Sequence, residues 1–105
     1  IEDISNNVFE DINDFNLYCK ERGASLYLTF APVLKNCMLN TEQSLATYQS
    51  ELAKRFDAPI ISKIEDCLMP YKYMFDGTMH LNDDGVRYYC KQLADDLKKV
   101  RKENN

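Results

Sequence analysis

Amphipathic helical segments alternate with short apolar runs along this sequence, and that alternation limits the possible folds more than any other feature. Apolar residues recur at helical spacing over residues 4–19 and again over residues 45–56. Residues 25–31 alternate large apolar side chains with smaller or amphipathic ones, and Ile60-Ile61 forms a second apolar run. The sequence therefore predicts the order helix, strand, helix, strand, followed by a last helix that begins near Asn82.

Each expected helix carries an apolar stripe that should face the core. The stripes are Ile4, Val8, Ile12, Phe15 and Cys19 in the first helix, Leu45, Tyr48, Leu52 and Phe56 in the second, and Val86, Tyr89 or Cys90, Leu93, Leu97 and Val100 in the last. Asn40 or Thr41 should cap the second helix, and Asn82 the last one. Residues 33–39 indicate a loop, and residues 63–81 predict no defined element.

Strands that are separated by helices favour a parallel sheet with right-handed crossovers. Both strands should then end at the same edge of the sheet, where α/β folds bind their ligands. We therefore expect an α/β fold with parallel strands and a functional site near the segment that precedes the last helix.

Composition excludes several classes of protein. The chain has 105 residues, enough for one domain, with 13 basic and 17 acidic side chains and a net charge of −4. Proteins that bind nucleic acid usually carry a basic patch, so we expect no nucleic-acid partner. The longest stretch without charge, residues 23–34, is twelve residues long, which is short of the ~20 that a membrane-spanning helix needs.

The four cysteines, Cys19, Cys37, Cys67 and Cys90, leave their chemistry open. They contain no CxxC pair and no Cys/His cluster, so we expect no zinc site. They can form disulfides in any of three pairings or remain buried thiols, and spacing does not choose between these states. The cellular compartment stays open on this observation.

The single histidine, His80, lies between the last expected strand and the last helix, four residues after Asp76. Gly77 permits a tight turn that would bring the Asp76 carboxylate to the imidazole Nδ1. In hydrolytic triads such a carboxylate orients the base and stabilises the imidazolium. Two other interpretations exist: Asp76 closes an Asx turn, or His80 binds a metal with Asp76, Asp83 or Asp84. No second histidine supports the metal, and the sequence predicts no cofactor.

The segment from Phe75-Asp76 through His80-Leu81-Asn82 to Gly85 resembles the C-terminal catalytic block of SGNH (GDSL-type) hydrolases. The order of elements before it is also similar to that family. The commoner form of the block has Asp and His three residues apart, so this chain resembles a side branch. The resemblance implies that His80 is the general base of a catalytic dyad and that Asp76 is its orienting carboxylate.

The family's Gly-Asp-Ser nucleophile and its glycine and asparagine oxyanion donors have no counterpart in this sequence. The serines all lack that context: Ser5, Ser25, Ser44, Ser50 and Ser62. Ser62 alone lies at an expected strand end, without a glycine elbow to expose it. Cys37 is the other formal candidate. We therefore expect residues 1–105 to be one unit, the C-terminal portion of an SGNH domain whose N-terminal part is absent.

The resemblance implies a three-layer α/β/α flavodoxin-like sandwich, of which this chain supplies the last strands. It implies a serine-dependent esterase or O-acyltransferase that acts on acyl-ester substrates: acylated glycans, lipids or small esters. It also favours a bacterial cell-envelope location over a cytoplasmic one. The isolated chain should be inactive because it lacks the nucleophile.

A second class of function remains open, a non-catalytic interaction module for a protein or glycan. In that interpretation Tyr71, Tyr73, Met74 and Phe75 form an exposed aromatic patch, whereas in an ordinary fold they cover the sheet edge. A response-regulator-like fold is a weaker third possibility, because residues 29–32 offer no acidic side chain at the end of the first strand.

Overall fold

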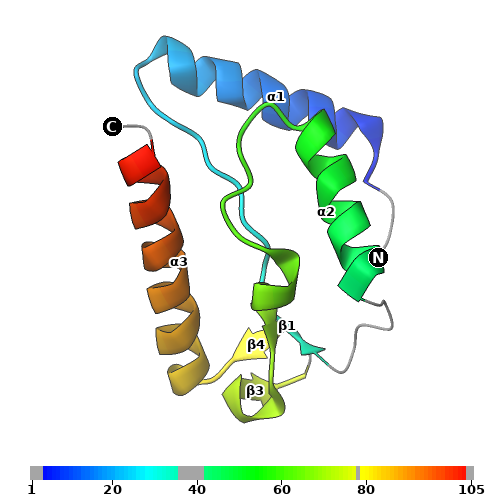
Figure 1. The fold of residues 1–105 in the computed structure, drawn as a ribbon, viewed down its shortest axis with the longest axis vertical. Coiled ribbons are helices and arrows are strands. Elements are labelled where there is room, and N and C mark those ends of the chain that lie inside the picture. The colour runs from blue at the N-terminus through cyan, green and yellow to red at the C-terminus, as the bar shows by residue number, and fades with distance from the viewer. Residues whose placement is uncertain (1–3, 36–41, 78, 104–105) are drawn as a thin grey trace.

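The computed structural model describes residues 4–35, 42–77 and 79–103, and these form a mixed α/β fold that is mostly helical with small sheets (Figure 1). Its elements are α1 (Asn6–Glu21), β1 (Val33–Leu34), α2 (Glu42–Arg55), the 3-10 helix η2 (Ile64–Cys67), β2 (Leu68–Met69), the 3-10 helix η3 (Tyr71–Tyr73), β3 (Met74–Asp76), β4 (His80–Leu81) and α3 (Asp83–Glu103). The mixed α/β class and the helical segments are confirmed.

The expected parallel pairing is present but is shorter than predicted. Leu28 forms an isolated parallel bridge with Ile60, and β1 pairs in parallel with β2. Within the expected strand 25–31, only Leu28 takes part in this pairing. The two contacts form one interrupted ribbon, because η2 adds residues between Ile60 and β2 that have no counterpart between Leu28 and β1.

Two predictions about loops are wrong. Val33 and Leu34, expected in a loop, form β1 because β2 offers them a partner far along the chain. Residues 63–81, expected to hold no defined element, contain two short 3-10 helices and three short strands. Elements this short cannot show a periodic pattern in the sequence. They form where a pairing partner lies beside them, and that partner is not visible locally. The expected caps Asn40 and Thr41 lie outside the described residues.

Helix α1 ends where its sequence predicts. Gly23 has a φ of 76°, a conformation that glycine adopts without steric cost. The N–H of Gly23 donates to the Lys20 carbonyl and the N–H of Ala24 donates to the Cys19 carbonyl, at 3.1 and 2.9 Å. These two bonds form the Schellman arrangement, which satisfies the last carbonyls of the helix.

Helices α1 and α2 pack together at one corner of the molecule. The rings of Phe9 and Phe56 lie 4.5 Å apart between centroids. Asn13 ties the end of α2 in place, since its Nδ2 donates to the Arg55 carbonyl at 3.0 Å and its Oδ1 accepts from the Asp57 N–H at 2.9 Å. The predicted apolar stripe of α2 is confirmed at Leu45 and Leu52, which are both buried.

The predicted stripe of α1 is partly wrong. Val8 and Phe15 are exposed, and Phe9 and Asn16 are buried in their place. The helix contacts α2 through Phe9 near one corner. The predicted stripe would require a core surface along the whole length of the helix. α1 therefore leaves apolar side chains in solvent along much of its surface.

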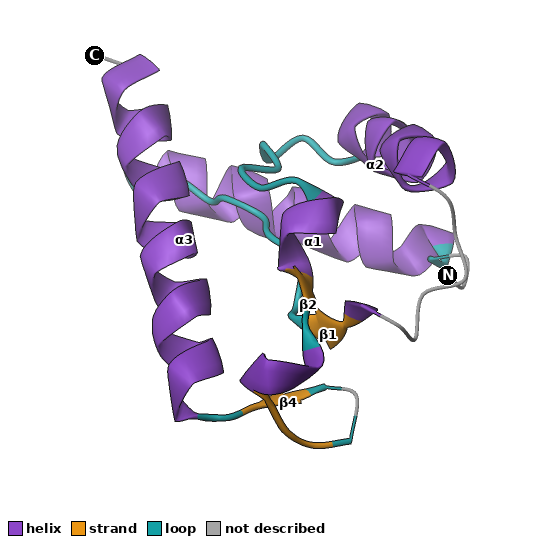
Figure 2. Cartoon of the chain, turned by 60° about the horizontal axis from the view of Figure 1, so that its bottom comes forward, coloured by secondary structure: helices purple, strands orange, loops and turns teal. Residues whose placement is uncertain are grey.

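Helix α3 lies on the opposite side of the extended segments from α2 in both views (Figures 1 and 2). Tyr89 links α3 to the extended segment that contains Phe30, because its hydroxyl donates to the Phe30 carbonyl at 2.6 Å. The stripe is wrong at Val86, which is exposed: the first turn of α3 meets η3 through Gly85 instead. Tyr89 faces inward and Cys90 is exposed, which resolves the alternative at those positions.

Within the ranges the structure covers, no helix combines the length and the apolar character needed to cross a bilayer.

Candidate functional site: the Asp76–His80 hairpin

Asp76 and His80 lie side by side at the end of a short hairpin. β3 and β4 pair antiparallel, and this register sets Asp76 opposite His80. The His80 Nδ1 lies 3.2 Å from the Asp76 Oδ1. The turn between them includes Gly77, whose φ of 63° is the left-handed conformation anticipated for a tight turn. The structure thus brings together the two residues that the sequence singled out.

The hairpin is held against α3 by Asn82. The Asn82 Oδ1 accepts a hydrogen bond from the Gly85 N–H at 2.8 Å, so the predicted N-cap is confirmed. The Asn82 Nδ2 donates to the Lys72 carbonyl at 2.7 Å, and the Asn82 N–H donates to the Tyr73 carbonyl at 2.9 Å. One side chain therefore caps the helix and fixes the backbone of η3.

Close packing at position 85 explains why this residue is a glycine. A Cβ at this position would collide with the Tyr73 carbonyl oxygen and would lie 3.0 Å from the Tyr73 Cβ. The Tyr73 ring also stacks on Tyr88 of α3, with centroids 4.8 Å apart. These contacts fix η3 and β3 on the first turns of α3. They thereby also set the position of His80, which precedes Leu81 in β4.

The Asp76–His80 contact contributes little to the stability of the fold. The side chain of Asp76 is 71% exposed and that of His80 is 75% exposed. Exposed ion pairs of this kind are worth about 0–1 kcal/mol. Within the described residues, the His80 Nε2 has no hydrogen-bond partner, so this nitrogen is available to an outside group.

The other acidic residues near His80 have structural roles on α3. Asp83 and Asp84 lie in its first turn, where carboxylates stabilise a helix, and Asp84 pairs with Arg87 at 2.9 Å. The described part of the chain contains no group of three or more His, Cys, Asp or Glu side chains that could hold a metal ion. No donor set here favours the metal interpretation of His80.

Ser62, the serine at the expected strand end, is poorly placed to act as a nucleophile. It is 6% exposed, and its Oγ lies 2.7 Å from the Thr29 Oγ1. Cys67 donates to the same Oγ over 3.9 Å. Burial raises the pKa of the Cys67 thiol, which disfavours the reactive thiolate. This part-buried cluster of Thr29, Ser62 and Cys67 satisfies the polar atoms of the two buried residues, Ser62 and Cys67, and the sequence offered no local signal for it.

The remaining nucleophile candidates do not approach the hairpin in any described contact. Cys37 lies outside the described residues, whereas Cys19, Cys67 and Cys90 are free thiols. Ser5 is at the start of α1, Ser25 is in the extended segment, and Ser44 and Ser50 are on α2.

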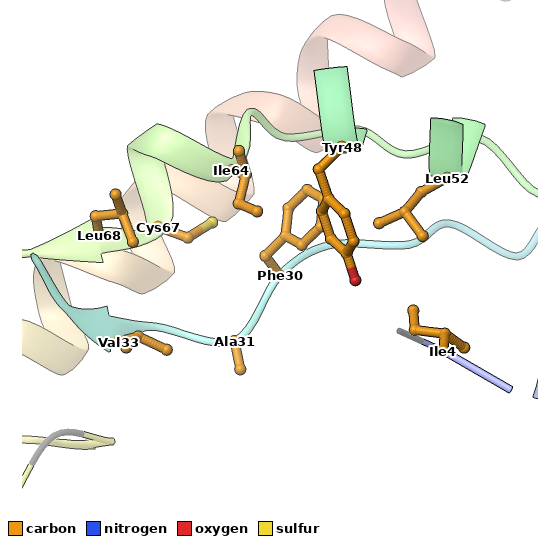
Figure 3. Close-up of a pocket in the computed structure, with 9 residues that line it drawn as sticks. All are labelled: Ile4, Phe30, Ala31, Val33, Tyr48, Leu52, Ile64, Cys67 and Leu68. Atoms are coloured by element: carbon orange, nitrogen blue, oxygen red, sulfur yellow. The ribbon is translucent and has the colours of Figure 1, made fainter. Parts of the chain in front are cut away.

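An apolar cavity of about 270 Å³ opens between α2, η2 and the extended segment near residue 30 (Figure 3). Its lining is almost entirely carbon and consists of Ile4, Phe30, Ala31, Val33, Tyr48, Leu52, Ile64, Cys67 and Leu68. Asp76 and His80 do not line it, so it is a separate feature from the hairpin.

The aromatic segment before the hairpin is divided between packing and exposure. Met74 is buried and Tyr73 stacks on Tyr88, whereas Tyr71 and Phe75 are 79% and 76% exposed. The sequence predicted a single environment for all four residues, whereas in the structure the first and the last of them face solvent and the two between them pack.

Comparisons with models of protein families, with curated proteins and with solved structures found no match to this chain.

Proposed function

We propose that this chain supplies the histidine and its orienting carboxylate to a serine-dependent ester hydrolase or O-acyltransferase of the SGNH type. The observation that carries the proposal is the contact of 3.2 Å between the His80 Nδ1 and the Asp76 Oδ1, on a histidine side chain that is 75% exposed. This is the arrangement of a general base whose tautomer is fixed by a carboxylate. The fold does not need it for stability, because both side chains are exposed.

In the proposed reaction a serine from outside residues 1–105 attacks the ester carbonyl. The His80 Nε2 takes the serine proton as the new C–O bond forms, and Asp76 stabilises the imidazolium. The imidazolium then gives that proton to the leaving alcohol as the ester bond breaks. Water, or a hydroxyl of an acceptor, attacks the acyl-serine by the same route in reverse and releases the acid or the transferred ester.

The size of the molecule supports the proposal that residues 1–105 are the C-terminal portion of a larger three-layer domain. The accessible surface is 7759 Å², against about 6,100 Å² expected for a folded protein of 12.3 kDa. The radius of gyration is 15.0 Å, against about 13 Å for a compact chain of this length. Both values are those of a molecule with surface left to cover.

The arrangement of helices also supports that proposal. Parallel sheets occur almost only where helices cover both faces and further strands extend the sheet. Here α2 lies on one side of the parallel ribbon and α3 on the other, in the manner of the outer layers of an α/β/α sandwich (Figure 2). In this proposal additional strands extend the ribbon formed by Leu28, Ile60, β1 and β2.

The test uses the full-length protein that carries this segment, with p-nitrophenyl butyrate as substrate. His80→Ala and Asp76→Asn should each lower kcat/KM by at least about 100-fold. Asp84→Asn is the matched control, since Asp84 is equally exposed and makes its contact on α3, and it should keep full activity. His80→Ala should leave the free energy of unfolding within about 0.5 kcal/mol.

Two outcomes would defeat the proposal. One is full turnover by His80→Ala, which would remove the histidine from the reaction. The other is ester cleavage by residues 1–105 alone at a rate that depends on His80, which would contradict the external nucleophile. The resemblance extends the proposal to bacterial cell-envelope proteins with acylated glycans, lipids or small esters as substrates.

The second candidate is an interaction module without catalysis, and the exposure of Tyr71 and Phe75 favours it. Turnover of p-nitrophenyl butyrate separates the two. A hydrolase shows turnover that His80→Ala abolishes, whereas a binding module shows no turnover in either form.

A further inference from the structure

The β3–β4 hairpin contains a bulge beside the Asp76–His80 pair. Met74 is paired with Leu81 and Asp76 with His80, so Phe75 is an extra residue on β3. A bulge of this kind places two residues of one strand opposite one residue of its partner, and it redirects side chains. Bulges are common next to active sites for this reason.

The register shows which side chains share a face. Met74 points inward, since it is buried, and its neighbour Phe75 therefore points outward. On β4, His80 points outward because it is exposed and contacts Asp76. If the same residues formed a regular strand without a bulge, Asp76 would alternate back to the inner face of Met74. The bulge thus sets Phe75, Asp76 and His80 on one outer face.

Among the described residues, no ring contact accounts for the position of Phe75. Its side chain is 76% exposed, and within the described residues it makes no ring contact. Met79, next to His80 in the chain, is also exposed. Two large apolar side chains in solvent beside a candidate catalytic pair offer carbon contacts and no hydrogen-bond donors.

The surrounding charge indicates what these contacts would accept. The charged side chains nearby are of both signs: Asp84 pairs with Arg87 at 2.9 Å on the first turn of α3, and the Lys72 ammonium lies over the Tyr73 ring. No charge of a single sign dominates beside Phe75 and Met79, and their exposed carbon surface favours contact with an apolar, uncharged group. A neutral ester with an apolar acyl chain suits both features.

We propose that Phe75, on the same bulged face as Asp76 and His80, contacts the acyl chain of a neutral ester and selects chains of several carbons over acetyl. This inference rests on the function proposed above and adds the substrate class. Each methylene that reaches the ring loses water-exposed surface, and full burial of one is worth about a fourfold gain. On an open face we expect about half that effect for each methylene.

The experiment compares p-nitrophenyl acetate, butyrate and hexanoate with the full-length protein. The wild type should prefer hexanoate to acetate by about 16-fold in kcat/KM, a gain of about twofold for each of the four added methylenes. Phe75→Ala should reduce that preference to about twofold, while acetate turnover stays within twofold of wild type. Phe75→Leu should restore most of the preference, because it keeps an apolar side chain on the bulge.

Tyr71→Ala is the matched control, because Tyr71 is 79% exposed in the same segment but lies outside the bulge. It should leave the chain-length preference unchanged. An equal loss with acetate and hexanoate in Phe75→Ala would overturn the inference while the esterase proposal stands. Absence of any His80-dependent turnover in the wild type would overturn both.

Discussion

The two ends of this molecule differ in how completely they are packed. At the hairpin end, Asn82 makes a helix cap and backbone bonds at once, and Gly85 lets η3 touch α3. At the other end, α1 contacts α2 near Phe9 and leaves Phe15 and its neighbours in solvent. The hairpin end is determined by residues close in sequence, whereas the outer surface of α1 lacks the cover that would make it a core face.

The difference separates structure that depends on residues close in the sequence from structure that depends on residues far apart in it. The described contacts that orient His80 all lie within residues 71–88, so the candidate site is local. The α1 face and the narrow parallel ribbon depend on long-range packing. Substitutions at matched positions in the two regions test this contrast.

The two glycines at these ends should respond very differently to alanine. Gly85→Ala forces a Cβ against the Tyr73 backbone, and we expect a loss of about 3 kcal/mol in the free energy of unfolding. At Gly23 an added Cβ meets nothing within 4 Å, so only the positive φ is penalised, by about 1 kcal/mol. Urea unfolding of both variants measures this. Equal losses would contradict the tight packing of the hairpin end.

The two helix caps offer a second, smaller contrast. Asn82→Ala removes the acceptor of the Gly85 N–H and the side-chain bond to the Lys72 carbonyl but keeps the backbone bond to Tyr73, for an expected loss of about 2 kcal/mol. Ser5 precedes α1 without a side-chain cap bond, so Ser5→Ala should change stability by less than about 0.5 kcal/mol. Thermal unfolding followed by circular dichroism compares them. A loss at Ser5 as large as at Asn82 would remove the contrast.

A still smaller effect should arise in the centre, where Tyr89 and Cys67 join the two regions. Burial raises the pKa of Tyr89 above its ordinary 10.0 and that of Cys67 above 9.0. A raised pKa in the folded state means that stability is full below the ordinary value and falls as the pH rises through the folded value. The free energy of unfolding should therefore stay level from pH 6 to about pH 8 and decline above about pH 9.

Tyr89→Phe should make that alkaline decline shallower. Tyr71→Phe, a change at an exposed phenol, should leave the curve as in the wild type. A decline of the same steepness in Tyr89→Phe would show that other groups cause it. Urea titrations at fixed pH values between 6 and 11 provide the measurement.

Much of the helical framework was predictable from the sequence, because helix periodicity and caps are local. The apolar spacing of α1, its end at Gly23 and the Asn82 cap each depend on residues that are close neighbours in the sequence. The contact between Asp76 and His80 was also anticipated, since only a turn separates them. Their catalytic role stays a prediction.

The remainder depended on distant partners. Val33–Leu34 becomes a strand only because β2 lies beside it, and Thr29 meets Ser62 across 33 residues. The bulge at Phe75 is invisible in the sequence, since it exists only relative to the register with His80 and Leu81. The stripe of α1 was misplaced because periodicity identifies an apolar face but does not identify what will cover it.

The uncovered face of α1 has a calorimetric consequence. The heat capacity of unfolding follows the apolar surface that becomes hydrated, and a complete domain of this length would give about 1.3–1.6 kcal/mol/K. Phe15, Leu17 and Tyr18 are already in contact with water when the chain is folded. They are 52%, 57% and 51% exposed, so unfolding newly hydrates only the remainder of each, and the heat-capacity increment of these 105 residues should lie toward the lower end of that range. A smaller increment gives a stability curve with less curvature, so that the free energy of unfolding changes less with temperature.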